Sequence, residues 1–317
     1  MKRYFPFLRG KQNEMMAVRE LAERIAEQGN VIPIIEPVKD NPTTRISLDR
    51  YIEVSMPFLF ICNPAYGEFA SRPDELFAEL IEEVLIEYDN WTPTLQVERG
   101  STRSEISGFL DRYEDWGEDG EVAVIYNGLP ASAPARALLN DGRILHHVFL
   151  DRRVGAEYVN GIPEARRVII SDPFNRQARN ADYPDRELFT DMNTVAGNPR
   201  RLDFGDFSIV GDHYADTGGP AYAVTLHHIH FQNDSGPLDI SHYISDRTET
   251  TADTPGKIIE ALAKLVRALN QLRPNDTQAC EEYREMAEAE VSRGLGYMKR
   301  LAIKHHLELM LDGGIGL

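Results

Sequence analysis

The chain has 317 residues, 42% of them hydrophobic, which is enough for one large core of the α/β-barrel class. Its 51 acidic residues outnumber 34 basic ones and give a formal net charge of −17, which argues against broad binding to nucleic acid. The two cysteines, Cys62 and Cys280, lie far apart in apolar or helical stretches, so we expect neither a disulfide framework nor a cysteine zinc site.

The N-terminal residues MKRYFPFLRGKQ contain a short apolar stretch that Pro6 and charged residues interrupt. This pattern matches neither a secretion signal nor a membrane span. With so few cysteines, a reducing compartment fits best. We therefore expect a cytoplasmic protein without a membrane partner.

Short apolar runs rich in β-branched and aromatic residues alternate with longer segments of helical periodicity. This alternation is typical of parallel strands joined by helices. Strands are expected at residues 4–8, 31–35, 58–62, 94–97, 122–126, 145–150, 168–170 and 207–210. Helices are expected at residues 12–28, 73–87, 102–113, 130–139 and 255–272. Eight strands predict a (β/α)8 TIM-like barrel of the α/β class.

The alternative is an open, doubly wound sheet. Such a sheet normally carries a glycine-rich phosphate turn after its first strand, with the pattern GxGxxG. Here the residues after the first predicted strand are Arg9, Gly10, Lys11 and Gln12, which do not match. The barrel is therefore the favoured architecture.

Two stretches are additional to the eight strands and connecting helices of a minimal barrel. Residues 175–202 are polar and far longer than a usual connection, which predicts a cover or an ordered excursion inserted before the last strand. Residues 221–231 read as a further strand, and residues 232–254 as a polar loop.

The C-terminal residues 276–311 have an apolar stripe at helical spacing, with Gly294 and Gly296 as expected bends. They predict an added C-terminal helix. The expected division is a (β/α)8-type barrel domain at residues 1–272, which includes insertions at 174–203 and 214–254, and a C-terminal helical extension at 273–317.

Polar residues follow every predicted strand. In a closed barrel the loops after the strands face one mouth, where the chemistry of such barrels takes place. Each residue alone has an ordinary explanation, because polar residues are common in turns for local backbone reasons. The set consists of Arg9, Lys11, Glu36, Asn63, Glu98, Arg99, Asn127, Asp151, Arg152, Arg153, Asp172, Asp212 and His213.

Four carboxylates in this set would repel one another unless a cation or the neighbouring arginines compensated them. The set therefore predicts either a divalent cation, Mg²⁺ or Mn²⁺, or a ring of ion pairs. The candidate metal ligands are Glu36, Asp151, Asp172 and Asp212. The candidate catalytic residues are Glu36, Asp212 and His213. The candidate ligand-binding residues are Arg9, Lys11, Asn63, Arg99, Asn127, Arg152 and Arg153.

Histidines add two weaker signals. His213 beside Asp212 has the chemistry of a metal ligand or general base, and equally that of an ordinary turn residue. His228 and His230 would point to one face of a strand and His227 to the other. No third ligand with a familiar spacing follows, so a structural or interface role is favoured for this run.

Well-known catalytic motifs are absent from the sequence. It contains no GxSxG, Walker loop, HExxH or CxxC. Hydrolases with a nucleophile elbow, P-loop ATPases, zincins and thioredoxins therefore have no support.

The opening YFPFLRGKQNEMMAVRELAE, followed by NVIPIIEPVKD and later by FSIVGDHY, resembles the phage-derived beta protein family. The resemblance covers most of the chain in order, although each motif is short. It implies a barrel-like α/β fold and a bacterial or phage origin, sometimes beside a restriction-like nuclease gene in mobile or defence regions. It assigns no catalytic residues, so Lys11, Glu36, Asp212 and His213 are motif positions only.

The leading hypothesis is a soluble bacterial or phage barrel protein that acts with a partner, a nuclease, in antiphage defence. The resemblance supports it, and the acidic charge suits a basic protein surface better than DNA. A homo-oligomer is also compatible with the sequence. The alternative is a metal-dependent hydrolase or lyase that acts on a phosphorylated small molecule or nucleotide at the barrel mouth.

Overall fold

The computed structural model describes residues 2–116, 120–128, 137–200, 202–215, 221–233, 236–271 and 276–315. The chain forms two compact units. The first comprises Met1–Met15, Ala22–Asp172 and Arg200–Phe207, and the second comprises Met16–Leu21, Pro173–Pro199 and Ser208–Leu317. This division differs from the expected one, because both insertions group with the C-terminal residues rather than with the barrel.

The first unit is a parallel barrel of the TIM type. Its strands are β1 (Phe7–Leu8), β2 (Ile34–Ile35), β3 (Phe58–Ile61), β4 (Trp91–Glu98), β5 (Val122–Asn127), β6 (Ile144–Leu150), β7 (Arg167–Ser171) and β9 (Asp203–Asp206), hydrogen-bonded in this order. Tyr4 pairs with both Val31 and Phe204, and the Phe5 N–H donates to the Phe204 carbonyl at 2.8 Å. These bonds close the barrel, which confirms the predicted fold and excludes the open sheet.

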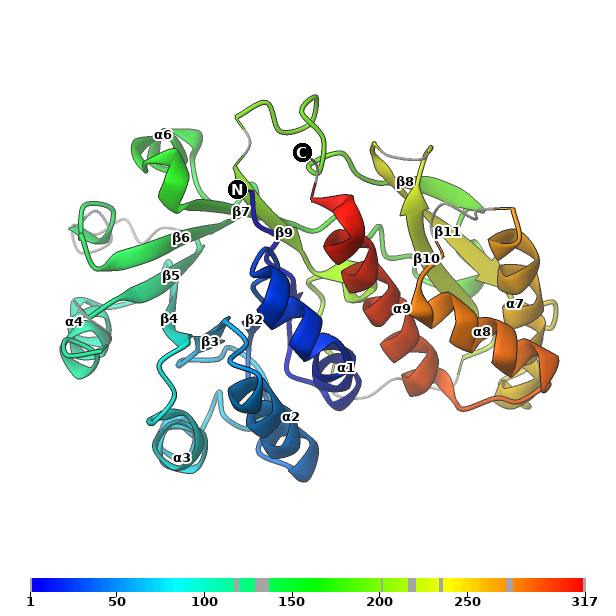
Figure 1. The fold of residues 1–317 in the computed structure, drawn as a ribbon, viewed down its shortest axis with the longest axis horizontal. Helices are drawn as coiled ribbons and strands as arrows, with labels where there is room; N and C mark the ends of the chain where they lie inside the picture. The colour runs from blue at the N-terminus through cyan, green and yellow to red at the C-terminus, as the bar shows by residue number, and fades with distance from the viewer. Residues whose placement is uncertain are drawn as a thin grey trace. The chain divides into compact units, whose positions relative to one another are not determined.

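Helices lie outside the strands of the barrel (Figure 1). They are α1 (Gln12–Gln28), α2 (Pro42–Glu53), α3 (Pro73–Leu76), which continues as the π-helical segment η1 (Phe77–Leu85), α4 (Arg103–Arg112) and α6 (Ala156–Gly161), before the short turn η2 (Glu164–Arg166). Gly29 ends α1 in the left-handed conformation, as its position predicts. Helix α2 was not predicted, although Asn41 caps it and Pro42 opens it. Of the helix expected at 130–139, residues 130–136 lie outside the described residues.

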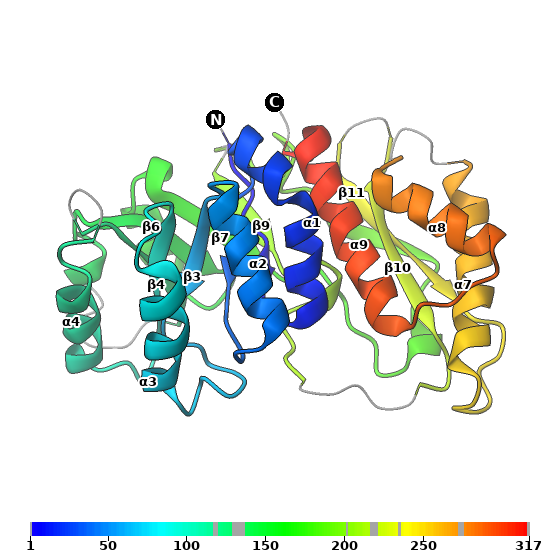
Figure 2. The same ribbon diagram turned by 60° about the horizontal axis from the view of Figure 1, so that its bottom comes forward.

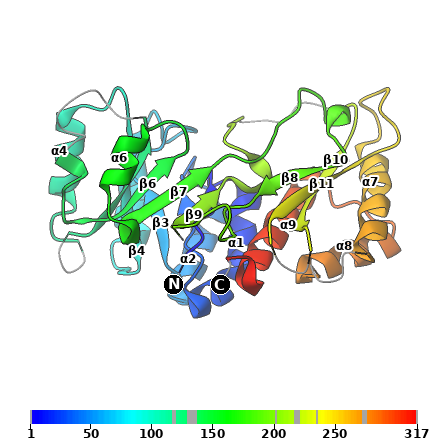
Figure 3. The same cartoon turned by 90° about the horizontal axis from the view of Figure 1, so that it is seen from above.

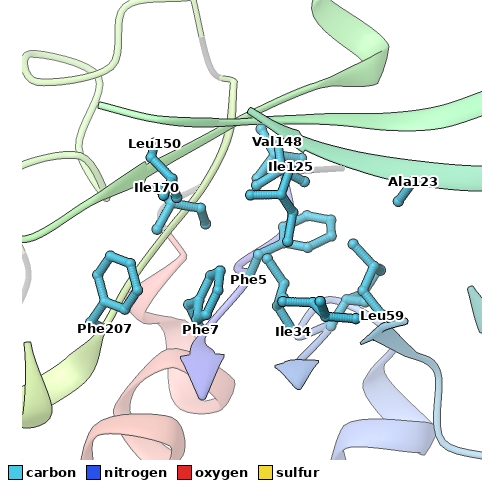
Figure 4. Packing of buried hydrophobic residues seen from close by; sticks show 13 residues of the cluster. Phe5, Phe7, Ile34, Leu59, Ala123, Ile125, Val148, Leu150, Ile170 and Phe207 are labelled. Carbon is cyan, nitrogen blue, oxygen red and sulfur yellow. The ribbon is translucent and has the colours of Figure 1, made fainter. Parts of the chain in front are cut away.

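Alternate residues of the strands fill the interior of the barrel (Figure 4). The cluster comprises Phe5, Phe7, Ile32, Ile34, Leu59, Ile61, Ala123, Ile125, Val148, Leu150, Val168, Ile170 and Phe207. Side chains alternate along a strand. The next side chains on the inner side, just beyond the ends of β1, β2 and β3, are therefore those of Arg9, Glu36 and Asn63. The core therefore determines which side chains reach the mouth.

The last barrel strand lies four residues earlier than predicted. Residues 207–210 were expected as a strand because they are apolar, but Ser208–Val210 form a 3-10 turn, η4, and the strand is Asp203–Asp206. Gly205 explains the shift. A Cβ atom at this position would lie only 1.8 Å from the Phe5 carbonyl oxygen, so the closure of the barrel requires glycine.

The second unit has its own antiparallel sheet, in the order β10 (Thr225–Phe231), β11 (Leu238–Ile244), β8 (Arg186–Thr190). The strand expected at 221–231 is confirmed as β10. The prediction of a polar loop at 232–254 is wrong, because this stretch contains β11. The insertion at 175–202 is an ordered excursion that contains η3 (Asn180–Asp182) and β8.

Three helices cover one side of this sheet (Figures 2 and 3). They are α7 (Thr254–Leu269), α8 (Gln278–Glu288) and α9 (Leu295–Leu309), after which η6 (Met310–Gly314) follows. The expected C-terminal helix is thus two helices, with Glu290 and Gly294 in left-handed conformations between them. Their apolar stripes share one core with β10 and α7, in which Leu226, Leu262 and Tyr283 are buried. Within the described ranges, no helix combines the length and apolar character needed to cross a membrane.

Candidate functional site

Arg9 and Glu36 form a buried ion pair at the ends of β1 and β2. The Arg9 guanidinium donates to Oε2 of Glu36, and the Ala65 backbone N–H donates to Oε1 at 2.7 Å. Glu36 is fully buried, and Arg9 is 4% exposed. Both oxygens of the predicted catalytic carboxylate are therefore engaged by the protein itself.

Aromatic rings surround the Arg9 guanidinium. Its central carbon lies 4.7 Å from the ring centroid of Tyr66, 5.2 Å from that of Phe7 and 5.3 Å from that of Phe207. The electron-rich faces of such rings favour a cation, and a ring that displaces water also strengthens the pairing with Glu36. Arg9 is thus held in place from several sides.

Gly10 fixes the turn that follows β1. It has a φ of +60°, and a Cβ atom there would lie 2.7 Å from the Glu36 carbonyl oxygen. Only glycine suits both conditions. The first two motifs of the sequence, Arg9-Gly10-Lys11 and the Glu36-Pro37 end of β2, therefore meet in one structural feature.

Asn63 has a structural role. Its side-chain amide donates to the Gln96 carbonyl at 2.8 Å, and its side-chain oxygen accepts from the Gln96 N–H at 2.7 Å. This exchange continues the pairing of β3 with β4 beyond the last residue of β3. The polar side chain at this strand end therefore bonds to the backbone of the neighbouring strand.

The ends of β5 and β6 carry exposed charges. Arg153 donates to the Asn127 side-chain oxygen, and the Arg152 and Asp151 side chains lie 3.4 Å apart. The Arg152 side chain is 93% exposed. Beyond β4, Arg99 is exposed as well. These arginines lie at the end of the barrel formed by the loops after the strands, where they could contact an anionic ligand.

The remaining predicted residues differ in their setting. Lys11 is half-buried and precedes α1, and Asp172 is exposed directly after β7. Asp212 and His213 were expected at the end of the last barrel strand, but that strand ends at Asp206. They follow η4 and belong to the second unit, where Asp212 is half-buried and His213 exposed.

The predicted carboxylates Glu36, Asp151, Asp172 and Asp212 do not form a close group of ligand atoms among the described residues. In the part of the chain that the structure describes, one group of three His, Cys, Asp or Glu side chains has all its ligand atoms within 4.8 Å of one another, namely His228, Cys280 and His305. Glu36 instead has the ion-paired arrangement, the other alternative that the sequence left open.

A chain of polar contacts on the second sheet was not predicted from the sequence. Nδ1 of His227 lies 2.7 Å from Nδ1 of His242, whose Nε2 lies 3.2 Å from Oε1 of Glu187. Burial, with the neighbouring His242 as a smaller cause, lowers the pKa of His227 to about 3. His227 and His242 are paired residues of β10 and β11. Because the polar sequence of β11 predicts a loop, no sequence signal joins these two histidines.

His228 and His230 lie on the other face of β10, as the alternation predicts. Their ring centroids are 6.3 Å apart, and both side chains are buried. Burial is the main cause that lowers the pKa of each. The structure therefore places imidazoles on both faces of one strand, neutral at physiological pH.

No protein-family model matches the chain, and the comparison with curated proteins found no match. Among solved structures, the chain is similar to a glycoside hydrolase family 5 from Bacteroides vulgatus, with 7% sequence identity and a TM-score of 0.41. The match covers 68% of this chain and 60% of that one, so the chain spans about three fifths of its length. An identity of 7% gives no basis for carrying over residues or chemistry.

Proposed function

We propose that this chain is a bacterial or phage protein of the cytoplasm that binds a nuclease and acts with it in the conflict between phages and their hosts. The resemblance to the phage-derived beta protein family supports this proposal. Two of the motifs behind that resemblance converge on the Arg9–Glu36 pair and the Gly10 turn. Because these residues pair with one another, they suit a stable binding scaffold.

The charge of the chain supports a basic protein partner, and this is the observation that carries the proposal. The net charge is −17, and residues 68–90 are one of the acidic stretches of the chain. That stretch contains Glu68, Asp74, Glu75, Glu79, Glu82, Glu83, Glu87 and Asp89, with Arg72 as its one basic residue. A nuclease must present basic groups to DNA, and opposite potentials speed and align the association of two proteins.

The exposed part of this acidic segment lies along α3, η1 and the turn that follows. Asp74, Glu82 and Glu87 are exposed, and Ile86 beside them is 45% exposed. Arg45 neutralises part of the charge, because it lies 3.0 Å from Glu83. An acidic surface with an apolar residue in it suits the rim and centre of a protein interface.

Phage infection of cells that carry the gene with its natural neighbours tests the proposed function. We expect the intact locus to lower the plating efficiency of some phages in a panel, and deletion of this gene to restore it. A locus that protects equally well without this gene would contradict the proposal.

A second candidate is a metal-dependent hydrolase or lyase for a phosphorylated small molecule or nucleotide. The exposed side chains of Arg99 and Arg152 favour it, because guanidinium groups bind phosphate and lie here at the end of the barrel that holds active sites. Asp151 and Asp172 would supply ligands for Mg²⁺ or Mn²⁺. A cation that binds only the folded state would raise the melting temperature. A melt that is unchanged by millimolar Mg²⁺, Mn²⁺ or chelator would exclude this candidate.

A further inference from the structure

Three side chains that are distant in sequence meet inside the second unit. His228 comes from β10, Cys280 from the first turn of α8, and His305 from α9. All three are 0% exposed. Their potential ligand atoms, two imidazole nitrogens and one sulfur, lie within 4.8 Å of one another.

The ring of His305 is oriented with one nitrogen toward this group. Nε2 lies 2.7 Å from the Ile229 carbonyl oxygen, which only accepts, so Nε2 carries the proton. With that proton on Nε2, Nδ1 of the imidazole ring has a lone pair. Histidines that bind metals typically donate their other N–H to a carbonyl or carboxylate in this way.

The buried imidazole ring of His228 lacks hydrogen-bond partners for its polar atoms within the described residues. Its ring stacks on that of His305, with centroids 4.1 Å apart and planes at 16°. Neither of its ring nitrogens has a hydrogen-bond partner among the described residues, although the side chain is fully buried. A buried N–H or lone pair without a partner costs free energy, and a metal ion bound to one nitrogen would remove the cost for that nitrogen.

The distance between Cys280 and His305 fits a shared ion. Sγ lies 3.6 Å from Nδ1. Tetrahedral zinc, with Zn–S of about 2.3 Å and Zn–N of about 2.1 Å, places the two ligand atoms about 3.6 Å apart. A hydrogen bond from the thiol to Nδ1 fits the same distance, but it would leave His228 unsatisfied. An ion accounts for both observations.

We propose that His228, Cys280 and His305 bind one Zn²⁺ ion inside the second unit. Imidazole and thiolate suit zinc, whereas Mg²⁺ and Ca²⁺ prefer oxygen ligands. Binding replaces the thiol proton of Cys280, which is released to solvent, and changes no oxidation state. The Thr277 hydroxyl, 3.4 Å from Sγ and 2.7 Å from Nδ1, can then donate to the thiolate. The ion would join β10, α8 and α9 across one core.

The spacing explains why the three ligands could not be recognised as one site from the sequence. His228 and Cys280 are 52 residues apart, since 280 − 228 = 52, and Cys280 and His305 are 25 apart. Zinc motifs are recognisable because their ligands come in close pairs. Here each ligand comes from a different element. The proposed zinc ion is independent of the proposed nuclease partner.

Metal titration of the purified full chain tests the proposal. When Zn²⁺ is added after treatment with chelator and dialysis, the folded chain should retain one equivalent of it through gel filtration, as measured by elemental analysis. Co²⁺ in place of Zn²⁺ should produce the charge-transfer absorption of a cobalt–thiolate bond. Zn²⁺ should also raise the melting temperature, and chelator should lower it again.

The two cysteines provide a matched pair of variants. Cys280→Ser should lose the cobalt–thiolate absorption and most of the retained zinc. Cys62→Ser should keep both, because Cys62 belongs to the barrel unit. His305→Gln should weaken zinc retention at least tenfold, with circular dichroism as the check on folding. If Cys280→Ser does not fold, the absorption of the unsubstituted chain decides. A folded chain that retains no zinc and shows no cobalt–thiolate absorption would overturn the proposal, as would equal binding by folded Cys280→Ser.

Discussion

The Glu36 carboxylate accepts a hydrogen bond from the Arg9 guanidinium, and both side chains are buried where β1 and β2 end. This pair joins two strands whose turns carry the most recognisable motifs of the sequence. It also occupies an oxygen of the carboxylate that the sequence offers as a catalyst or metal ligand. The local chemistry is therefore that of a charge-compensated scaffold.

Removal of Arg9 should destabilise the chain strongly. Arg9→Met leaves the Glu36 carboxylate buried without its cation, which typically costs about 3–5 kcal/mol. The double variant Arg9→Met/Glu36→Gln should recover part of this loss, because the buried charge is gone and the amide oxygen still accepts from Ala65. Urea unfolding measures both effects.

Arg152→Met is the control for this pair. Its side chain is 93% exposed, so its contact with Asp151 is screened by water and its loss should change stability by less than about 0.5 kcal/mol. Equal urea midpoints for Arg9→Met and the unsubstituted chain would show that the buried pair contributes nothing.

Gly205→Ala should disrupt the closure of the barrel. The added Cβ would lie 1.8 Å from the Phe5 carbonyl oxygen, so β9 must separate from the N-terminal strand. We expect a loss of about 3 kcal/mol, at the upper end for overpacking. Gly142→Ala is the matched control, because a Cβ there meets nothing within 4 Å. Thermal melts that are identical for the two variants would contradict this account of closure.

Acid should destabilise the barrel through His146. Burial is the main cause that lowers the pKa of this residue to about 3, with Arg3 and His147 adding to the effect, from an ordinary value of 6.5. The unfolded chain therefore binds a proton below about pH 6.5 that the folded chain does not bind until about pH 3. Its contribution to stability is complete above pH 6.5 and is lost as the pH falls through this window.

His146→Gln removes that proton uptake. Between about pH 6 and pH 4, unfolding free energy should fall less steeply in the variant than in the unsubstituted chain, by about 1.4 kcal/mol per pH unit. Urea unfolding at several pH values gives the two slopes. Parallel slopes would mean that His146 is protonated equally in the folded and unfolded chains.

The barrel was predictable because its signals are local. Alternate apolar residues in Ile32–Ile34 and Leu59–Ile61 mark strands whose inner faces form the core, and Gly29 marks the end of α1. The last strand was not predictable, because Asp203 and Asp206 make its sequence polar. Its position depends on the contact of Gly205 with Phe5. A sequence does not display a constraint between residues 200 positions apart.

The second unit was harder to predict for the same reason. β11 has the sequence LDISHYI, in which the adjacent Ser241 and His242 interrupt the alternation of polar and apolar residues, and its polar side chains are buried by partners from other elements. His242 meets His227 and Glu187, and Ser241 meets His230 at 2.9 Å. These contacts can be recognised only once the pairing of β8, β10 and β11 is known. The polar sequence therefore predicted a loop.

We propose that this acidic barrel protein binds a nuclease, and the mass of the protein expressed from its natural locus tests this binding most directly. Light scattering after purification of the tagged chain should give a complex with the nuclease of that locus, heavier than the chain alone at 35.9 kDa, that dissociates as salt rises. Glu82→Gln/Glu87→Gln should weaken the complex, whereas Glu285→Gln/Glu288→Gln, an equal change of exposed charge on α8, should not. A folded chain that elutes at 35.9 kDa or a whole multiple of it, apart from the nuclease at every salt concentration, would contradict the claim.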